Sequence, residues 1–422
     1  MSPLSLHTRT MLVSRLWMAM QFYFAHWQDV DPDFDLEADI SDLMQVAIDT
    51  ESRWAFTLAM IRFISRLNNS HTWYFDNQIF EERRQKRAYR LTALPDDLWM
   101  VKESYVDVLD AGDIITHIDD KPIIEWYNEV RPYINASSER IARRAFDGLL
   151  RLFISQHTTY TLSDGRQVLV NHDEAKDTQT LSDLHTTGRW VDDGDIALIH
   201  IPSFNEERFQ DVALDYVEQF KDAHTIIFDM RDCTGGNTPS KLIRALMDRP
   251  CQMWTEATPA NFALFHYRYQ EREWGHAYTQ DAEYKAYYDG MVSHFRRPML
   301  MWSPSVTLPE NPIYTGRILM LIGIEIGSAG EDFVIPFKSS GRATLIGENT
   351  LGSTGQPYHY RLIDDIWLAV GAKRAYMPDG SSYEGIGIAP DIHLQATVAD
   401  LRAGRDVVLE RALEMARSVA TD

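Results

Sequence analysis

The sequence predicts an α/β protein with a largely parallel sheet at its core and smaller units ahead of that core. From about residue 188 onward, short apolar segments alternate with amphipathic segments, which is the pattern of repeated βαβ units. In the first 80 positions, apolar residues recur at intervals of three and four, as in amphipathic helices. Short strand-like segments lie between these two regions. Together these observations predict a mixed fold built from more than one unit.

The changes of pattern place the boundaries, and a chain of 422 residues has room for two to three structural units. We expect an N-terminal helical domain at 1–80, a small β unit at 85–135, a helix and hairpin connection at 138–187, and an α/β core at 188–422. An aromatic-rich segment at 252–312 has no regular pattern. Long excursions from a compact core are often functional, so we predict an insertion that walls a substrate cleft. Packing of the aromatic side chains is the alternative.

Three helices are predicted in the N-terminal domain, at 12–26, 39–48 and 52–67. The first is apolar enough to suggest a signal peptide or a membrane anchor. Arg15 and His26 interrupt it, however, and no small-residue cleavage site follows. It is typical of a buried amphipathic helix, and we therefore expect a cytoplasmic protein with no membrane partner.

The two central parts are rich in β-branched and aromatic residues, which favour strands. The expected strands lie at 89–94, 98–102, 113–118, 158–162 and 167–170, the last two joined by a turn at Asp164-Gly165. Helices are expected at 124–130 and 138–156, and a loop at 171–187.

In the core, apolar runs bounded by turn residues predict buried strands at 196–201, 225–230, 318–322 and 343–346. The helices between them are expected at 205–220, 239–247 and 329–335. Pro336 is expected to interrupt the last of these helices. A longer strand region is expected at 365–376.

The charge of the chain argues against one class of partner. There are 41 Lys and Arg residues against 62 Asp and Glu, a formal net charge of −21, whereas nucleic-acid binding needs clustered basic residues. The basic cluster at 83–87 is typical of a solvated surface. Cys233 and Cys251 are too few for a disulfide framework and lack the spacing of metal ligands. We expect no nucleic-acid partner and no metal, and the cysteines fit a reducing compartment.

Ser328 is a candidate nucleophile because of its place in the predicted fold. It follows the strand at 318–322 and begins a helix, so it lies at the carboxyl edge of the sheet, where α/β proteins place their sites. The N–H groups and the dipole of a helix N-terminus also favour developing negative charge. Residues 328–331 have the sequence Ser-x-x-Glu, the capping-box pattern, so a serine that only caps the helix is the alternative.

Gly235 and Gly236 follow the predicted strand at 225–230. Paired glycines allow a sharp turn and bring N–H groups close to a ligand, which suits an oxyanion hole. A tight connection between a strand and a helix is the alternative. Because this turn and Ser328 both follow strands of one expected sheet, they can face one cleft.

His71 ends the third predicted helix, within the sequence Asn-Ser-His-Thr at 69–72. Local pattern alone gives no reason to connect His71 with Ser328, and a structural or solvated histidine is the alternative.

Four segments in order resemble the tail-specific (C-terminal processing) peptidases and the core of the tricorn protease. They are residues 67–72, 226–236, 327–356 and 378–391. The resemblance implies a crotonase/Clp-like α/β core with an N-terminal helical bundle and a small PDZ-like β unit. The PDZ-like unit is indicated by the short segment at 112–115.

The family has two catalytic designs. Tail-specific enzymes pair the serine with a lysine that follows a Phe-Gly pair, but the matching segment at 351–353 is Leu-Gly-Ser. The lysines that follow Ser328 are Lys338 and Lys373, and neither fits that motif. The tricorn-like design, with a Ser-His pair, a nucleophilic Ser and a late Glu, fits better.

Carried over residue by residue, the tricorn-like design implies Ser328 as the nucleophile and His71 as the base. It implies that Glu384, through the hydroxyl of Ser70, orients His71 and stabilises its charged form. Outside this resemblance, Glu384 is typical of a solvated loop acid.

The same resemblance implies an oxyanion hole made by the backbone N–H groups of Ala329 and of Gly235 or Gly236. Gln356 is expected to help shape the site. Cys233 has no partner at a telling spacing and is expected to be an incidental buried cysteine.

The implied function is a serine peptidase that hydrolyses peptides or unfolded protein tails through an acyl-enzyme, without a metal or cofactor. A homo-oligomer is left open. One alternative is a non-catalytic protein of the same fold that binds hydrophobic ligands or peptides. Another is an α/β-hydrolase-type esterase with Ser328, Asp364 or Asp365, and His393, although Ile326 departs from the Gly-x-Ser-x-Gly motif.

Overall fold

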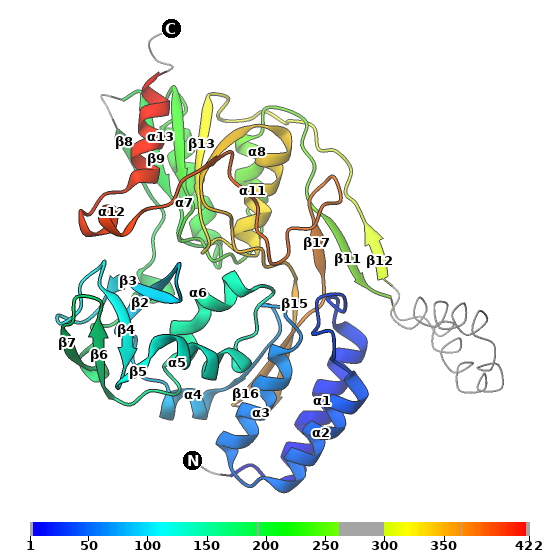
Figure 1. Ribbon diagram of the computed structural model, residues 1–422. Helices are drawn as coiled ribbons and strands as arrows, with labels where there is room; N and C mark the ends of the chain where they lie inside the picture. Colours follow the sequence, from blue (N-terminus) through cyan, green and yellow to red (C-terminus); the bar gives the residue numbers. More distant parts are fainter. Residues whose placement is uncertain (1–2, 192–193, 261–298, 364, 419–422) are drawn as a thin grey trace, which may run out of the picture.

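The computed structural model describes residues 3–191, 194–260, 299–363 and 365–418. The described strands form four sheets. The largest parallel sheet and its helices lie at one end of the molecule, and the N-terminal helices lie at the other end (Figure 1).

The core sheet has the strand order β18-β14-β13-β10-β9-β8. Its strands are β8 (Thr187–Val191), β9 (Ile196–His200), β10 (Thr225–Asp229), β13 (Arg317–Ile322), β14 (Ala343–Gly347) and β18 (Ile392–His393). β8 pairs antiparallel with β9, and the other neighbours pair in parallel. The prediction of a largely parallel core is confirmed, although the two edge strands were not predicted.

Helices cover both faces of this sheet. On one face lie α7 (Glu207–Gln219), α8 (Ser240–Leu246) and α11 (Ala329–Ser340), which share an apolar core with β9, β10 and β13. On the other face lies α13 (Val407–Ser418), preceded by the short helix α12 (Val398–Arg402). Because parallel strands end at the same edge, the loops that follow β10 and β13 lie beside each other there.

Helix α11 is longer than predicted. Pro336 was expected to interrupt it, yet the helix continues to Ser340 and ends at Gly341 in a left-handed conformation with φ of 64°. A proline inside a helix removes one backbone donor and destabilises the helix. Phe333 and Phe337, on either side of Pro336, are fully buried in the core, and this packing holds the helix together.

The N-terminal domain consists of three helices packed on strands from a distant part of the chain. The helices are α1 (Leu6–Tyr23), α2 (Leu36–Asp49) and α3 (Arg53–Ser65), followed by α4 (Asn77–Arg83). The strands are β1 (Trp73–Asp76), β16 (Ile366–Gly371) and β15 (Pro357–Ile363), all antiparallel. Ile366, Leu368 and Val370 of β16 belong to the apolar core of α1–α3. The N-terminal helices are thus completed by strands that follow Ser328 in sequence.

A second six-stranded sheet lies between these two regions of the chain. Its strands are β2 (Tyr89–Leu94), β3 (Leu98–Ser104), β4 (Ile114–Ile118), β6 (His157–Leu162) and β7 (Gln167–Asn171), with β5 (Lys121–Pro122) beside β4. Helices α5 (Ile123–Val130) and α6 (Glu139–Leu150) pack on it around the buried Trp99 and Phe146. Three short 3₁₀ helices are η1 (Arg131–Tyr133), η2 (His172–Glu174) and η3 (Leu181–Asp183). The predicted strands and hairpin of this part are confirmed.

A small sheet lies beside the core, made of β12 (Met299–Trp302), β11 (Thr255–Pro259) and β17 (Arg374–Tyr376). The predicted insertion at 252–312 supplies β11 and β12, and its middle part at 261–298 lies outside the described residues. In the part of the chain that is described, none of the helices combines the length and the apolar character that a membrane span requires.

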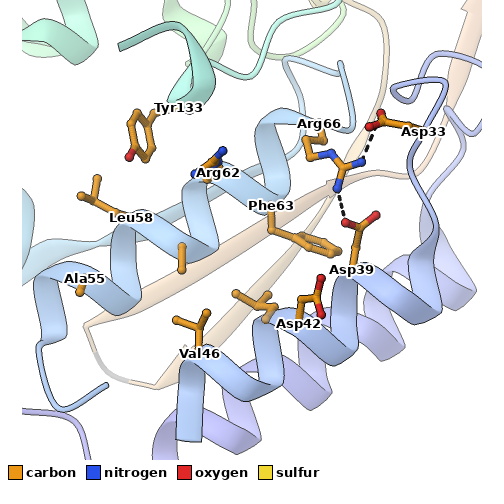
Figure 2. A pocket seen from close by; sticks show the side chains of 12 residues that line it. Asp33, Asp39, Asp42, Val46, Ala55, Leu58, Arg62, Phe63, Arg66 and Tyr133 are labelled. Atoms are coloured by element: carbon orange, nitrogen blue, oxygen red, sulfur yellow. Dashed lines mark hydrogen bonds and ion pairs between the residues drawn. The ribbon is translucent and has the colours of Figure 1, made fainter. Parts of the chain in front are cut away.

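A groove of about 720 Å³ lies between α2 and α3 (Figure 2). Arg66 at its rim pairs with Asp33 and Asp39, while apolar side chains such as Phe63 form its floor. The residues that line this groove include no predicted catalytic residue, so the groove is separate from the candidate site.

Candidate active site

Ser328 lies where the chain leaves β13 and enters α11, in an uncommon backbone conformation. Its φ is 52° and its ψ is −126°. Residues with side chains rarely adopt positive φ, and such conformations cost about 1–3 kcal/mol and cluster at functional sites. Although Ser328 is the N-cap residue of α11, its side chain makes no capping hydrogen bond. The capping interpretation is therefore wrong, and the hydroxyl does not serve the helix end.

Gly235 packs directly on the backbone at Ser328. A Cβ atom at Gly235 would lie 2.7 Å from the carbonyl oxygen of Gly327 and 2.9 Å from Cβ of Ser328, so only glycine fits. Within the described residues, the backbone N–H groups of Ala329 and Gly236 donate no hydrogen bond. The structure thus brings the glycine pair and Ala329 together at Ser328, and the N–H groups of Gly236 and Ala329 have no hydrogen-bond acceptor among the described residues.

A cavity of about 450 Å³ opens beside Ser328. This volume is within the range of small-molecule and peptide-side-chain sites. Its walls come from the turn after β10, from β11, from α11, and from the chain around residues 353–359 and 373–383. Besides Ser328, its lining residues with charged or polar side chains include Asn237, Thr238, Glu256, Asp332, Ser353, Thr354, Gln356, His359, Lys373 and Tyr383.

Ser353 connects His71 with Ser328. The Oγ atom of Ser353 lies 2.9 Å from Nδ1 of His71, and the N–H of Ser328 donates to the Ser353 carbonyl oxygen at 3.3 Å. Among the described residues, no hydrogen bond joins Ser328 and His71 directly. The imidazole of His71 is thus held by the hydroxyl of Ser353 at Nδ1 and also has a hydrogen bond with the backbone of Thr354. Sequence reasoning placed Ser353 in the recognised motif but gave it no role.

His71 is neutral in this environment at ordinary pH. Burial, together with the nearby His26 and Lys373, lowers its pKa from 6.5 to about 4. The backbone of Thr354 acts in the opposite direction. A neutral imidazole is the form that a general base requires.

His26 is a fully buried neighbour of the site that sequence reasoning did not identify. Its Nε2–H donates to the carbonyl oxygen of Lys373 at 3.0 Å, and its Nδ1 lies 3.5 Å from Asp29. A Cβ atom at Gly355 would lie 3.4 Å from both His26 Nε2 and His71 Cβ, so the two histidines flank this glycine. Burial lowers the pKa of His26, and Glu384 raises it. In the sequence His26 is a lone histidine after an apolar helix, which carries no catalytic signal.

Glu331 anchors the segment that carries Ser353. This fully buried carboxylate accepts hydrogen bonds from the hydroxyl of Thr350 at 2.5 Å, the N–H of Gly352 at 2.7 Å and the N–H of Ser353 at 3.1 Å. Burial outweighs the opposing effect of these three hydrogen bonds and raises the pKa of the Glu331 carboxyl group to about 8. The acid of the Ser-x-x-Glu motif therefore binds the chain that positions His71, not the start of its own helix.

Glu384 and Ser70 are not joined by a hydrogen bond in the described structure. Oε2 of Glu384 accepts from the N–H of Thr354 at 2.7 Å, while Oε1 has no partner. The Ser70 hydroxyl is also buried without a partner, and it lines a separate apolar cavity of about 290 Å³. Glu384 is thus close to the Ser353 segment, whereas Ser70 is not among the residues that line the cavity at Ser328.

The two lysines considered from the sequence lie in different places. Lys338 forms an ion pair with Asp391 and does not line the cavity. Lys373 does line it, and its Nζ lies 3.4 Å from Glu256. Gln356 lines the same cavity.

Two other nucleophile arrangements find no support in the geometry. Cys233 is fully buried, and burial raises its pKa to about 12, so it remains a thiol. His393, the histidine of the esterase alternative, is exposed on β18 and is not a lining residue of the cavity. Asp364 lies outside the described residues, and Asp365 lies in the turn directly before β16.

Comparison with known proteins gives a family match for the α/β core. Peptidase family S41 matches residues 195–394, a span that contains Gly235, Ser328 and Glu384 but not His71. A curated relative, the Chlamydia pneumoniae protein CPj1016/CpB1054, is 34% identical over 95 residues. That match spans 22% of this chain and only 15% of the relative's length.

Several solved structures share the fold. Mature CPAF in complex with lactacystin has a TM-score of 0.70 at 15% identity, with 98% of each chain covered. The photosystem II D1 C-terminal processing protease has a TM-score of 0.52 at 14% identity, with 92% of this chain and 93% of that chain covered. The tricorn protease has a TM-score of 0.50 at 14% identity, with 99% of this chain and 37% of that chain covered. Residues 195–394 of this chain thus match a domain of peptidase family S41, and the chain as a whole shares the fold of these solved structures.

Proposed function

We propose that this protein hydrolyses peptides or protein tails through an acyl-enzyme, with Ser328 as the nucleophile and His71 as the base. The observation that supports this most is the position of Ser328, strained at a helix N-terminus beside Gly235 and linked through Ser353 to His71. The strained backbone at Ser328, the N–H groups without acceptors and the neutral imidazole of His71 all suit acyl transfer. A helix end with a purely structural role requires none of these features.

In the first step, the imidazole of His71 removes the proton of the Ser328 hydroxyl as Oγ attacks the carbonyl carbon of the scissile peptide bond. A serine hydroxyl is too weakly acidic to attack without such a base. The N–H groups of Ala329 and of Gly236 or Gly235 receive the negative charge of the tetrahedral intermediate. His71 then protonates the leaving amine, and a water molecule releases the acyl group by the same steps in reverse.

Glu384 and Ser70 remain part of the proposal as groups that favour the charged form of His71. The carboxylate of Glu384 acts through its hydrogen bond to the Thr354 N–H, next to Ser353. Ser353 is an additional positioning residue, because its hydroxyl holds Nδ1 of His71. The base and the nucleophile thus come from opposite ends of the sequence.

The substrate and setting follow from the same resemblance. We infer unfolded protein tails or peptides as substrates, and a tricorn-like arrangement of the catalytic residues. The sheet of β2–β4 is the proposed PDZ-like unit. Both cysteines are free and buried, which fits the proposed cytoplasmic location.

The test is covalent labelling with a fluorophosphonate, followed by mass spectrometry of the labelled peptide. We expect one labelled residue, Ser328, in the folded protein and none in Ser328→Ala. A folded protein that does not react would favour the alternative, a non-catalytic protein of this fold that binds a hydrophobic ligand or a peptide. The observation that favours this non-catalytic alternative is that no direct hydrogen bond joins Ser328 and His71 among the described residues.

A further inference from the structure

We propose that the cavity beside Ser328 selects a basic side chain, Arg or Lys, on a residue next to the cleaved bond, and that Asp332 is the residue that recognises it. This inference rests on the proposed peptidase function and names the class of substrate.

Asp332 lies one helical turn after Ser328. Its N–H donates to the Ser328 carbonyl oxygen at 3.0 Å, and both residues line the cavity. Side chains of an α-helix lean toward its N-terminus, so the Asp332 carboxylate extends toward the nucleophile's end of α11. A substrate side chain next to the scissile bond therefore enters the space that this carboxylate faces.

Among the described residues, the Asp332 carboxylate has one side-chain hydrogen-bond donor and forms no ion pair. The hydroxyl of Thr238 donates to its Oδ2 atom at 2.7 Å. Burial raises the pKa of Asp332 to about 6, so the group is ionised at neutral pH and above. A half-buried carboxylate with one neutral partner is incompletely satisfied, because ionised groups removed from water need paired charge.

The other charged groups of the cavity already neutralise each other. Lys373 lies 3.4 Å from Glu256 Oε2 and 4.8 Å from the ring centroid of Trp254. The indole N–H of Trp254 donates to the same carboxylate oxygen at 3.0 Å. Lys373 also acts on Asp332 from a greater distance and lowers its pKa, but among the described residues its ion pair is with Glu256 and not with Asp332. His359 and Tyr383 are the other titratable groups that line the cavity.

A basic side chain supplies the missing counter-ion. A guanidinium binds a carboxylate through two parallel N–H donors, and an ammonium binds it as a point charge. An acidic side chain in the same place would meet like charge, and an apolar one would leave Asp332 unpaired. The cavity therefore discriminates by charge.

The experiment has two stages. Cleavage sites in a denatured protein are first mapped by mass spectrometry. Quenched peptides built on one such site then carry either arginine or citrulline, its neutral isostere, at each of the two positions that flank the bond. We expect kcat/KM for the arginine peptide to exceed that for the citrulline peptide at least about tenfold at one of the positions. The ratio is expected to fall near one in Asp332→Asn.

Asp215→Asn is the matched control, because Asp215 is exposed on α7, outside the cavity, and its loss changes the net charge equally. This control should keep the preference for arginine. A wild-type protein without the preference, a preference that persists in Asp332→Asn, or an equal loss in Asp215→Asn would each overturn the inference. No cleavage of any peptide together with no labelling of Ser328 would instead overturn the proposed peptidase function.

A measurement on the unaltered protein covers the case in which Asp332→Asn does not fold. Benzamidine, a cation, should slow fluorophosphonate labelling of Ser328 at concentrations at which neutral benzamide does not. Equal protection by the two compounds would contradict a role for the Asp332 charge.

Discussion

At the scale of single residues, the hydroxyl of Ser353 connects His71, the proposed base, with the surroundings of Ser328, and lies 2.9 Å from Nδ1 of His71. Ser353→Ala removes that contact and lets the imidazole turn. We expect kcat to fall about 10- to 100-fold with little change in KM, because loss of orientation acts on the chemical step. Ser353→Thr keeps a hydroxyl and should restore most of the rate. Equal kinetics for the alanine and the wild-type protein would remove Ser353 from the mechanism.

The pKa of His71 predicts an unusual pH profile. Since its pKa is lowered to about 4, the imidazole stays neutral well below the usual range of histidine. We expect the acid limb of kcat/KM to have its midpoint near pH 4, not near 6.5. A midpoint near 6.5 would show that the base is not held in this buried environment.

The same shift predicts the pH dependence of stability. Between about pH 4 and 6.5, the unfolded chain binds a proton at His71 that the folded chain does not bind, so the free energy of unfolding falls as the pH decreases through this window. Urea unfolding of the wild type and His71→Gln at several pH values isolates this contribution, because His26 and His172 shift in the same direction in both proteins. A difference between the two that does not vary with pH would contradict the assignment.

The sequence predicted Ser328 as a site residue because it follows a strand. It did not predict a role for Ser353, His26 or Asp332. Ser328 can be recognised from the local sequence, because an apolar strand pattern precedes it and a helix pattern follows it. His26 and Ser353 act only through contacts with residues far away in the sequence. Such contacts leave no local periodicity to detect.

At the scale of elements, helix α11 and the segment at 350–354 form one rigid unit through Glu331. Its carboxylate accepts three hydrogen bonds from that segment in a fully buried setting. Glu331→Ala leaves these donors unsatisfied, and we expect a loss of about 3 kcal/mol in the free energy of unfolding, together with reduced activity. Urea denaturation and peptide cleavage measure the two effects.

Glu410→Ala is a suitable comparison, because Glu410 is a partly exposed residue of α13 whose ion pair with Arg405 lies at the surface. Its effect should stay within about 0.5 kcal/mol. If Glu331→Ala were as mild as Glu410→Ala, the segment at 350–354 would not depend on this anchor.

The elements themselves were well predicted where they are apolar and internal. The buried strands β10 and β13 lie where the sequence placed them. Strands β1 and β15 were missed because each is stabilised by pairing with β16 and not by its own pattern. The end of α11 was misjudged because tertiary packing of Phe333 and Phe337 outweighs the local effect of Pro336.

At the scale of the whole molecule, the candidate site exists only where the N-terminal domain meets the core. β1, which follows His71 directly, pairs with β16 from the C-terminal part of the chain. The S41 match at 195–394 contains Ser328, the proposed nucleophile, whereas His71, the proposed base, lies outside it. The local sequence pattern does not predict that His71 and Ser328 lie together, because this depends on how two distant parts of the chain pack. Only the resemblance to known peptidases predicted the pair.

The most direct test of this assembly is the second-order rate constant for labelling of Ser328 by a fluorophosphonate, compared in wild type, His71→Gln and Lys373→Met. Lys373 is the other candidate base, because it lines the same cavity. We predict a fall of at least about 100-fold in His71→Gln, in line with the usual contribution of a general base, and a far smaller fall in Lys373→Met. Rapid labelling in a folded His71→Gln protein, with slow labelling in Lys373→Met, would contradict the account.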